Sequence, residues 1–409
     1  MYMGTSRRKF MEHVALAAST VALPSSLWGS TATSKFNLPK ADSADFWLEL
    51  SREAYHKNAD MISTMANQKP VLAVIKNNAY GLGDVEVAKI LDTNAHIEGF
   101  ALVKADRALA LRKAGVKKNI LLMGDFDESL GQDLVENDIT LSVFSTHAFH
   151  KIKRISYNTE EQINAALYID TGLGRMGIPF NQAFKLATMV SNSVNLKIKY
   201  TFSTLTTPKD FAKEQVRIFN ELIQELSRKG VNVGKTHLAP SFSLIDLPSS
   251  HQDMVRPGIL IHGSYPLANM DVSKKWPLMP TYRLKSRVMR LEKLSAGDTI
   301  GFSRFYKVTK DEWIATLPIG WGDGYDSGAE NGAKVLLNGT LYPVINVNAN
   351  HTNISLGANT LVKVGDIATL ISPEKPEITP EGFGKLVKRH NYLQINYKES
   401  IPKFIFDAF

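Results

Sequence analysis

A single lysine follows an apolar run that is expected to form a buried strand. Lys76 comes directly after residues 71–75 and before the polar, glycine-bearing segment 77–83. Such a strand carries its terminal amine from a packed interior into a loop. Because burial disfavours the charged ammonium, it lowers the pKa of the amine and makes it a nucleophile toward an aldehyde. A strand-end lysine that simply reaches water is the alternative.

Other polar side chains lie at the ends of further apolar runs. Arg175 lies in a glycine-rich segment after residues 166–170, Ser241 follows residues 236–239, and Arg256 lies just before another apolar run. The glycine-rich segment contains a formal G-x-G-x-x-G. No helical pattern opens inside it and no acidic residue lies about twenty positions further on, so it does not fit a dinucleotide-binding loop. A surface ion pair is the alternative role for Arg175.

Taken together, these segments resemble the signatures of the alanine racemase family. Residues 73–83 closely resemble its A-V-x-K-A-N-A-Y-G-x-G, and residues 170–177 resemble D-T-G-M-x-R-x-G. Residues 254–259 resemble M-V-R-x-G-I, and residues 237–241 resemble H-x-A-N-S with proline in place of asparagine. In the second half, residues 313–325 resemble W-x-x-x-x-P-I-G-Y-A-D-G-Y. The resemblance covers about residues 45–405.

The resemblance implies that the chain binds pyridoxal 5'-phosphate. Lys76 would form the internal aldimine and act as one base at the substrate Cα. Arg175 would hydrogen-bond the phenolic oxygen of the cofactor. Arg256 would pair with the ring nitrogen and keep it unprotonated, which weakens the cofactor as an electron sink. The other cofactor-binding residues would be Tyr80, Ser241, Gly258, Ile259 and Tyr397. The substrate gate would include Tyr325 and Asn350, the latter in place of a family aspartate.

The chain departs from the family on one half of the catalytic site. The family's second base is a tyrosine from the partner subunit, and an ungapped count back from Trp313 places it at Phe302. Phenylalanine has no exchangeable proton and cannot act as an acid or base. Tyr306 matches the family pattern in the same count, so it is not a displaced base. Thr201 replaces the histidine that polarises the tyrosine, and Tyr168 replaces a lysine that is often carbamylated.

The order of apolar runs predicts two domains. Eight β-rich runs, most with helical patterns between them, predict an N-terminal (β/α)8 barrel over residues 35–280, with a doubly wound open sheet as the alternative. These runs are 71–75, 99–103, 120–124, 140–144, 166–170, 198–202, 236–239 and 258–262. A helix is predicted over 46–65. Short, closely spaced strands predict a mainly β domain over 281–409. They are 288–291, 298–301, 312–317, 333–337, 340–346, 361–371 and 392–395.

The first 34 residues resemble a twin-arginine export signal. Arg7 and Arg8 lie between Ser6 and Phe10, and the apolar run 14–23 that follows is too short to span a membrane. The twin-arginine route carries folded proteins, which suits an enzyme that acquires its cofactor in the cytoplasm. We therefore expect a periplasmic protein without a stable membrane anchor after export, similar to the periplasmic broad-specificity amino-acid racemases.

Composition excludes several classes of function. The chain has no cysteine, so it has no disulfide and no thiolate metal site, and its histidines are scattered without an H-E-x-x-H pattern. The net charge of +8 is dispersed, which argues against a nucleic-acid partner.

Three functions remain. The first is a racemase that interconverts L- and D-amino acids. For this function, the resemblance implies a head-to-tail homodimer. The second is a one-base pyridoxal-phosphate enzyme of another reaction type, such as a lyase or an exchange enzyme. The third is an inactive paralogue that binds the cofactor.

Overall fold

The computed structural model describes residues 43–266, 272–388 and 397–409. The predicted export signal, and the predicted strand 392–395, lie outside these residues. None of the described helices has the length and apolar character needed to cross a membrane. The described residues also contain no group of three or more histidine, aspartate or glutamate side chains that could hold a metal ion.

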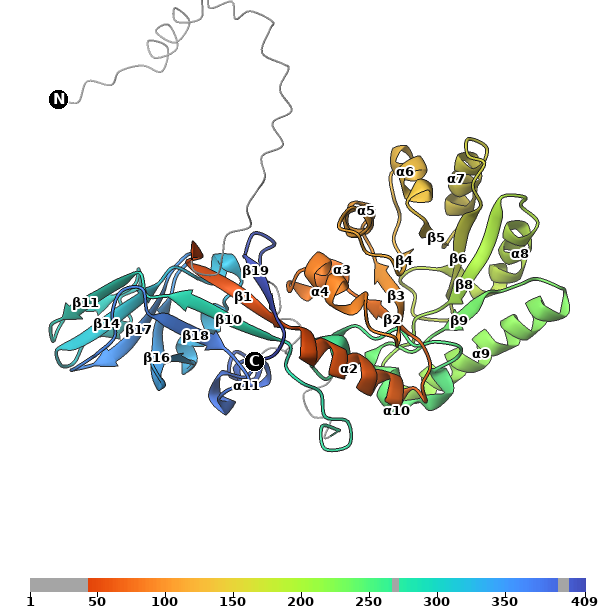
Figure 1. Cartoon of the computed structure of the whole chain (residues 1–409). Helices are drawn as coiled ribbons and strands as arrows, with labels where there is room; N and C mark the ends of the chain where they lie inside the picture. Colours follow the sequence, from red (N-terminus) through yellow and green to blue (C-terminus); the bar gives the residue numbers. More distant parts are fainter. Residues whose placement is uncertain (1–42, 267–271, 389–396) are drawn as a thin grey trace, which may run out of the picture. The chain divides into compact units, whose positions relative to one another are not determined.

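Parallel strands form the curled sheet of the N-terminal barrel (Figure 1). Their spatial order is β2-β3-β4-β5-β6-β8-β9, and the short strand β7 pairs with β6. The strands are β2 (Val71–Val74), β3 (Ile97–Leu102), β4 (Asn119–Leu122), β5 (Ile139–Val143), β6 (Ile163–Asp170), β7 (Ile178–Pro179), β8 (Leu196–Phe202) and β9 (Lys235–His237). Most of their residues are buried because the barrel interior covers one face and helices cover the other. The first seven predicted strands are confirmed.

An irregular segment closes the barrel between β9 and β2. The N–H of Leu72 donates to the carbonyl of Val255 at 2.8 Å, and the N–H of Val74 donates to that of Pro257 at 2.9 Å. The eighth strand, predicted over 258–262, is wrong. Gly258 leaves the extended conformation at φ −110° and ψ −81°, and the chain then enters the 3₁₀ helix η4 (Ile259–His262). The apolar run could not distinguish a buried 3₁₀ turn from a buried strand.

Helices follow the barrel strands and cover the outside of the sheet (Figure 1). They are α4 (Asp84–Leu91), α5 (Ala105–Lys113), α6 (Gly131–Glu136), α7 (Thr146–Ser156), α8 (Phe180–Ser191), α9 (Lys209–Arg228) and α10 (Ser241–Asp246), with the 3₁₀ helices η2 (Glu128–Leu130) and η3 (Pro248–Ser250). The short element α3 (Lys76–Tyr80) is instead a left-handed turn after β2. Helix α9 shows why they form. Its buried residues Ala212, Val216, Phe219, Leu222 and Leu226 recur at helical spacing along one face.

The predicted helix over 46–65 is wrong in its first part. Residues Phe46–Ser51 form strand β1, and the helix α2 covers Arg52–Met65. Ser51 ends the strand and caps the helix, because its Oγ accepts a hydrogen bond from the N–H of Ala54 at 3.1 Å. Strand β1 pairs with β10 (Tyr282–Arg287) and with β19 (Lys403–Phe406). The chain therefore contributes a strand to the β domain before it builds the barrel.

The β domain is a nine-stranded sheet with the order β11-β14-β17-β16-β15-β18-β10-β1-β19. Its other strands are β11 (Arg290–Leu294), β14 (Glu312–Leu317), β15 (Lys334–Leu337), β16 (Thr340–Val347), β17 (Thr352–Gly357) and β18 (Ile367–Ile371). A small ribbon joins β12 (Thr299–Ile300) to β13 (Tyr306–Lys307). The remaining elements are η5 (Trp321–Asp323), η6 (Ser327–Asn331), η7 (Pro376–Ile378) and α11 (Pro380–Leu386). Strand β14 has the predicted bounds, whereas β10, β17 and β19 were not predicted.

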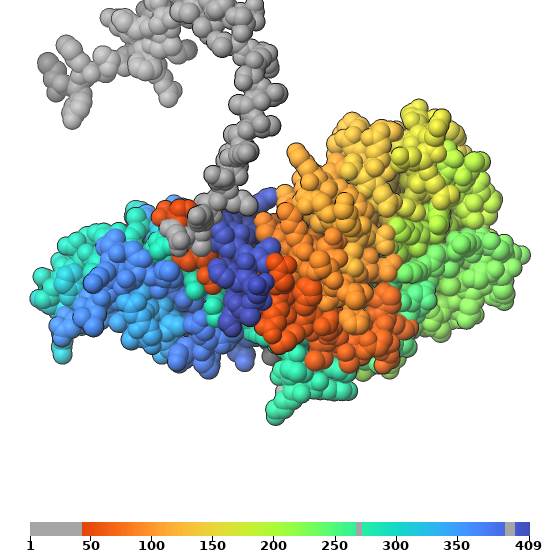
Figure 2. Space-filling view, in the orientation of Figure 1, coloured from red at the N-terminus to blue at the C-terminus, as the bar shows by residue number. Residues whose placement is uncertain are grey.

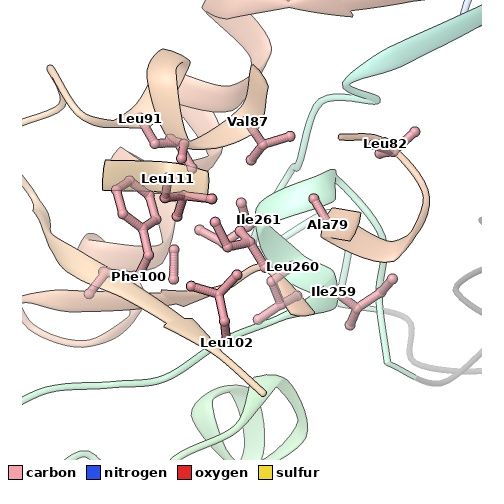
Figure 3. Packing of buried hydrophobic residues seen from close by; sticks show 14 of the residues in the cluster. Ala79, Leu82, Val87, Leu91, Phe100, Leu102, Leu111, Ile259, Leu260 and Ile261 are labelled. Carbon is pink, nitrogen blue, oxygen red and sulfur yellow. The ribbon is translucent and has the colours of Figure 1, made fainter. Parts of the chain in front are cut away.

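One part of the core supports the segment that carries Lys76. Ala79 and Leu82, which follow that lysine, belong to the same buried cluster as Ile259, Leu260 and Ile261 of η4 (Figure 3). Burial of a leucine or isoleucine side chain contributes about 1.5–3 kcal/mol. This packing holds the turn after β2 against the segment after the barrel closure.

Candidate active site

The chain turns back on itself directly after Lys76. Asn77, Asn78, Ala79 and Tyr80 have φ values of 54°, 55°, 48° and 57°, so four consecutive non-glycine residues adopt the left-handed helical conformation. This conformation costs roughly 1–2 kcal/mol per residue and persists only where the surroundings enforce it. The hydrogen bond from the N–H of Ala79 to the carbonyl of Ile75, 3.0 Å long, and the buried cluster below supply that support.

A cavity of about 720 Å³ lies at the carboxyl ends of the barrel strands. Its volume falls within the range of small-molecule sites. It is lined by seven of the residues that the sequence predicts for the site, namely Lys76, Tyr80, Arg175, Ser241, Arg256, Gly258 and Ile259. The loop Thr204, Leu205, Thr206 and Thr207 after β8 forms another part of the wall. The fold therefore gathers the seven predicted residues, which are up to 183 positions apart in the chain, around one space.

Two effects lower the pKa of Lys76. Burial disfavours its charged ammonium, and the guanidinium groups of Arg175 and Arg256 repel a third positive charge. A larger fraction of the amine is therefore neutral at physiological pH than for an exposed lysine. A neutral amine in a partly dry cavity can attack an aldehyde and can accept a proton.

Arg256 is buried and tightly held. Its Nε donates to Nδ1 of His237 at 3.2 Å, and its Nη2 donates to the carbonyl of Ser203 at 2.7 Å and to the hydroxyl of Thr204 at 3.2 Å. The guanidinium carbon also lies 5.2 Å from the ring centre of Phe202. Burial lowers the pKa of Arg256 to about 10, so the side chain stays charged at neutral pH.

Ser241 and two backbone amides form a set of polar groups on the cavity wall. The hydroxyl of Ser241 accepts hydrogen bonds from the N–H of Gly258 at 3.0 Å and from that of Leu260 at 3.5 Å. The hydroxyl of Tyr80 packs against Gly258 so closely that a Cβ at this glycine would lie 2.1 Å from it. Because the Ser241 oxygen accepts both amides, its own O–H remains to donate to an oxyanion such as a phosphate.

Gln215 of α9 is a buried residue that the sequence did not single out. Its Oε1 accepts hydrogen bonds from the N–H and hydroxyl of Thr206, at 2.8 and 2.9 Å. Its Nε2 donates to the hydroxyl of Thr171 at 3.2 Å and to the carbonyl of Thr204 at 3.3 Å. Gln215 thus joins the loop before Arg175 to the loop that contacts Arg256. A single amide on an amphipathic helix gives no sequence signal for this role.

Arg175 lies at the exposed edge of the cavity. Its loop is shaped by Asp170, whose carboxylate accepts the N–H groups of Gly172 and Gly174 at 2.9 and 3.1 Å. Among the described residues, the guanidinium of Arg175 makes no hydrogen bond or ion pair. It is therefore available to a bound molecule.

The other predicted site residues do not line this cavity. Tyr397 is buried with its ring 5.9 Å from that of Tyr282, and Tyr325 is buried with its ring stacked 5.2 Å from Phe383. Asn350 is exposed, and Phe302 is 98% exposed. Their roles at the site therefore remain predictions.

Thr201 and Tyr168, which replace a histidine and a lysine of the family, both have hydrogen-bond partners inside the barrel. The hydroxyl of Thr201 donates to the carbonyl of Val233 at 2.7 Å, and that of Tyr168 lies 3.3 Å from the hydroxyl of Thr204. The ring of Tyr168 stacks on Phe202 at 4.3 Å. Neither residue lines the cavity, so neither presents a base to it.

The residues around the cavity fit pyridoxal phosphate. A nucleophilic lysine suits the aldehyde, the Ser241 hydroxyl suits the phosphate, and the guanidinium of Arg256 suits the ring nitrogen. The free guanidinium of Arg175 suits the phenolate oxygen. All of these groups reach the same cavity.

Comparison with known proteins gives the family. A model of the alanine racemase N-terminal domain matches residues 50–266, and one of the alanine racemase C-terminal domain matches residues 281–402. The alanine racemase of Clostridium novyi (strain NT) is 31% identical over 304 residues, which cover 73% of this chain and 78% of that protein.

Solved structures share the fold. The alanine racemase of Clostridium difficile 630 has a TM-score of 0.82 at 25% identity, over 89% of this chain and 96% of that one. A histidine racemase from Leuconostoc mesenteroides subsp. sake NBRC 102480 has a TM-score of 0.80 at 24% identity, over 90% and 100%, which is a likeness of fold alone. With a barrel, a β domain and both family models matched, the chain belongs to the alanine racemase family.

Proposed function

We propose that this protein is a pyridoxal-phosphate-dependent amino-acid racemase of the alanine racemase type. The proposal rests on Lys76, whose amine has a lowered pKa. This lysine lines one cavity together with Arg175, Arg256 and Ser241. When bound, pyridoxal phosphate supplies an electron sink that acidifies the Cα–H of an amino acid.

The side chains around the cavity have distinct roles in this proposal. Lys76 would hold the cofactor, and its neutral amine would accept and return the Cα proton of the amino acid at Nζ. Arg256 would orient the ring, and the Ser241 hydroxyl, held by the amide of Gly258, would position the phosphate. Because Arg256 stays charged, it does not give its proton to the ring nitrogen, which favours simple proton exchange over other reactions.

The proposed position of Phe302 favours a second candidate function. Among the side chains that line the cavity, Lys76 has the amine with a lowered pKa. The position that the family resemblance assigns to the second base holds a phenylalanine, Phe302. A protein with one base removes and returns the Cα proton from one face. It is then either a slow racemase, with water serving the other face, or an enzyme that exchanges or transforms one enantiomer.

A comparison of two lysine variants tests the proposed function. Lys76→Ala removes the amine, and Lys104→Ala removes an exposed lysine that follows β3 at the same end of the barrel. Inversion of a panel of L- and D-amino acids should fall at least about 100-fold in the first variant, because general acid–base catalysis contributes 10²–10⁴-fold. Equal rates in both variants, or no inversion of any amino acid by the unchanged protein, would reject the racemase.

We further propose that two chains form a homodimer in which the β domain of each completes the site of the other. Large apolar side chains on the β domain support this: Phe302, Phe305 and Trp321 are 98%, 90% and 56% exposed. Sedimentation of the unchanged protein and of Phe302→Asp tests it, because a carboxylate in this apolar surface opposes burial against a partner. A dimer for the unchanged protein and a shift toward monomer for the variant are expected. A monomer for the unchanged protein, or no shift in the variant, argues against shared sites.

We also propose that the protein is exported to the periplasm. This proposal is supported by the pattern Ser6-Arg7-Arg8-Lys9-Phe10 before an apolar run, in a stretch outside the described residues. Replacing both arginines with lysine should retain the protein in the cytoplasm of a bacterium with a twin-arginine pathway. Fractionation that finds the variant in the periplasm would contradict this route.

A further inference from the structure

Arg107 on α5 binds two acidic side chains from distant parts of the chain. Its Nε donates to Oδ2 of Asp84 at 2.8 Å, and its Nη2 donates to Oδ1 of the same carboxylate at 2.5 Å. Its Nη1 donates to Oε1 of Glu399 at 2.6 Å. The planar guanidinium presents its donors in a fixed fork, so these bonds fix both acids relative to α5.

The first acid is attached to the turn that carries Lys76. Asp84 begins α4 directly after Gly83, and its carboxylate is fully buried. Its N–H donates to Oδ1 of Asn78 at 3.3 Å, and Asn78 is one of the four left-handed residues after Lys76. The Arg107–Asp84 pair therefore anchors the downstream end of this strained turn.

The second acid is attached to the segment that carries Tyr397. Glu399 lies two residues after that tyrosine, and Nζ of Lys403 donates to the carbonyl of Glu399 at 2.9 Å. The segment packs closely on the lysine turn, because a Cβ at Gly83 would lie 2.5 Å from Cδ of Lys403. In Figure 2 the C-terminal residues, in dark blue, lie against the orange residues of this part of the barrel.

We infer that Arg107 is a positioning residue that holds the Lys76 turn and the Tyr397 segment in one fixed arrangement through Asp84 and Glu399. The inference rests on the proposed function for the roles of Lys76 and Tyr397. Neither Arg107 nor its two acids line the cavity, so the effect on the site is indirect.

The burial of Asp84 distinguishes its pair with Arg107 from an ordinary surface ion pair. Arg154 and Glu128 also form two short hydrogen bonds, but both side chains are about half exposed. Solvent screens such a pair, and its loss has little effect. Asp84 has no exposed surface, and removal of its partner leaves a buried charge that the turn cannot accommodate without movement.

Two substitutions separate positioning from folding. Glu399→Gln removes only the link between the two segments, and the side chain is 64% exposed, so the fold is expected to remain intact. Arg107→Lys keeps the charge but loses the fork. Glu128→Gln is the matched control, because it breaks an exposed arginine–glutamate pair whose residues do not line the cavity.

Two readouts are measured on each purified protein. The first is hydrogen exchange of the backbone amides of residues 77–84 and 397–403, with and without cofactor. The second is the dissociation constant for pyridoxal phosphate. Arg107→Lys should speed exchange in both segments and raise the dissociation constant by about fivefold, a typical coupling between linked sites. Glu399→Gln should change both quantities in the same direction but less, because Glu399 is 64% exposed and solvent screens its bond to Arg107. The double variant should differ little from Arg107→Lys, because both changes break the same link.

Exchange in both segments that matches Glu128→Gln would overturn the inference. Faster exchange in 397–403 alone would also overturn it, since the link would then not reach the lysine turn. If the unchanged protein bound no pyridoxal phosphate, the proposed function would fail, and the exchange rates alone would still decide whether Arg107 couples the two segments.

Discussion

The Nε of Arg256 donates a hydrogen bond of 3.2 Å to Nδ1 of His237, and both side chains are buried. Because a guanidinium can only donate, Nδ1 must be the acceptor, and His237 is held as the neutral tautomer with its proton on Nε2. Burial and the charge of Arg256 hold the pKa of His237 well below its usual value. The pair therefore keeps a permanent positive charge at a fixed position beside the cavity.

The fork of Arg256 should be needed for cofactor binding. Arg256→Lys keeps the charge, but an ammonium cannot reach His237, Ser203 and Thr204 together. Loss of one charge-assisted hydrogen bond is worth about tenfold in binding, so the dissociation constant for pyridoxal phosphate should rise by about that factor. Arg112→Lys, which changes an arginine bonded only to backbone carbonyls, is the control, and equal binding by both variants would argue against the role.

Buried histidines should make the protein less stable in mild acid. Burial lowers the pKa of His262 from 6.5 to about 3, and His237 is lowered as well. As the pH falls below 6.5, these histidines become protonated in the unfolded chain but stay neutral in the folded chain. The free energy of unfolding therefore decreases. Each such histidine contributes a loss of up to about 1.4 kcal/mol per pH unit.

Urea unfolding between about pH 7.5 and 5.0, where most carboxylates stay ionised, measures this loss. His262→Gln removes one titrating group and should flatten the dependence on pH. His147→Gln, which changes an exposed histidine, should leave the dependence unchanged. Parallel pH dependences for the two variants would mean that His262 is not held neutral.

The residues at the strand ends could be predicted because each one follows a buried run. Lys76 and Ser241 lie after β2 and β9, and the barrel topology brings these ends together. The position of Phe302 relative to the cavity could not be tested in this way, because it lies on another domain. The eighth strand failed because Gly258 admits a 3₁₀ turn that an apolar run does not reveal.

Long-range polar contacts could not be predicted at all. Gln215 and Arg107 are ordinary polar residues of helices in the sequence, and their partners are up to 292 positions away. Strand β1 was missed because its apolar residues merge with the pattern of α2. Ser51 was the available signal, since a serine directly before a helical pattern is a preferred cap.

Gln215 should stabilise the two loops that it joins. Gln215→Leu leaves the N–H of Thr206 and the hydroxyl of Thr171 without this partner. An unsatisfied buried polar group costs about 1–3 kcal/mol, so the free energy of unfolding should fall by at least that amount. Gln224→Leu, an exposed change on the same helix, should alter it by less than about 0.5 kcal/mol. Equal stabilities would show that the loops hold without Gln215.

Replacing Phe302 with tyrosine should restore an acid–base group. The side chain is 98% exposed in the single chain, so the added hydroxyl should not disturb the fold. We expect Phe302→Tyr to speed inversion by up to about 100-fold, the lower end of the range for general acid–base catalysis. Phe305→Tyr, at a neighbouring exposed phenylalanine, is the control. Equal inversion rates in the two variants would mean that position 302 does not face the substrate.

The most direct test of the central claim, that Lys76 moves the Cα proton and lacks an opposite base, is exchange in heavy water. Holoprotein is mixed separately with L- and D-alanine, and deuterium at Cα and optical inversion are followed together. We expect one enantiomer to gain deuterium faster than it inverts, and Lys76→Ala to abolish this exchange. Equal exchange into both enantiomers at the rate of inversion, or exchange that survives Lys76→Ala, would contradict it.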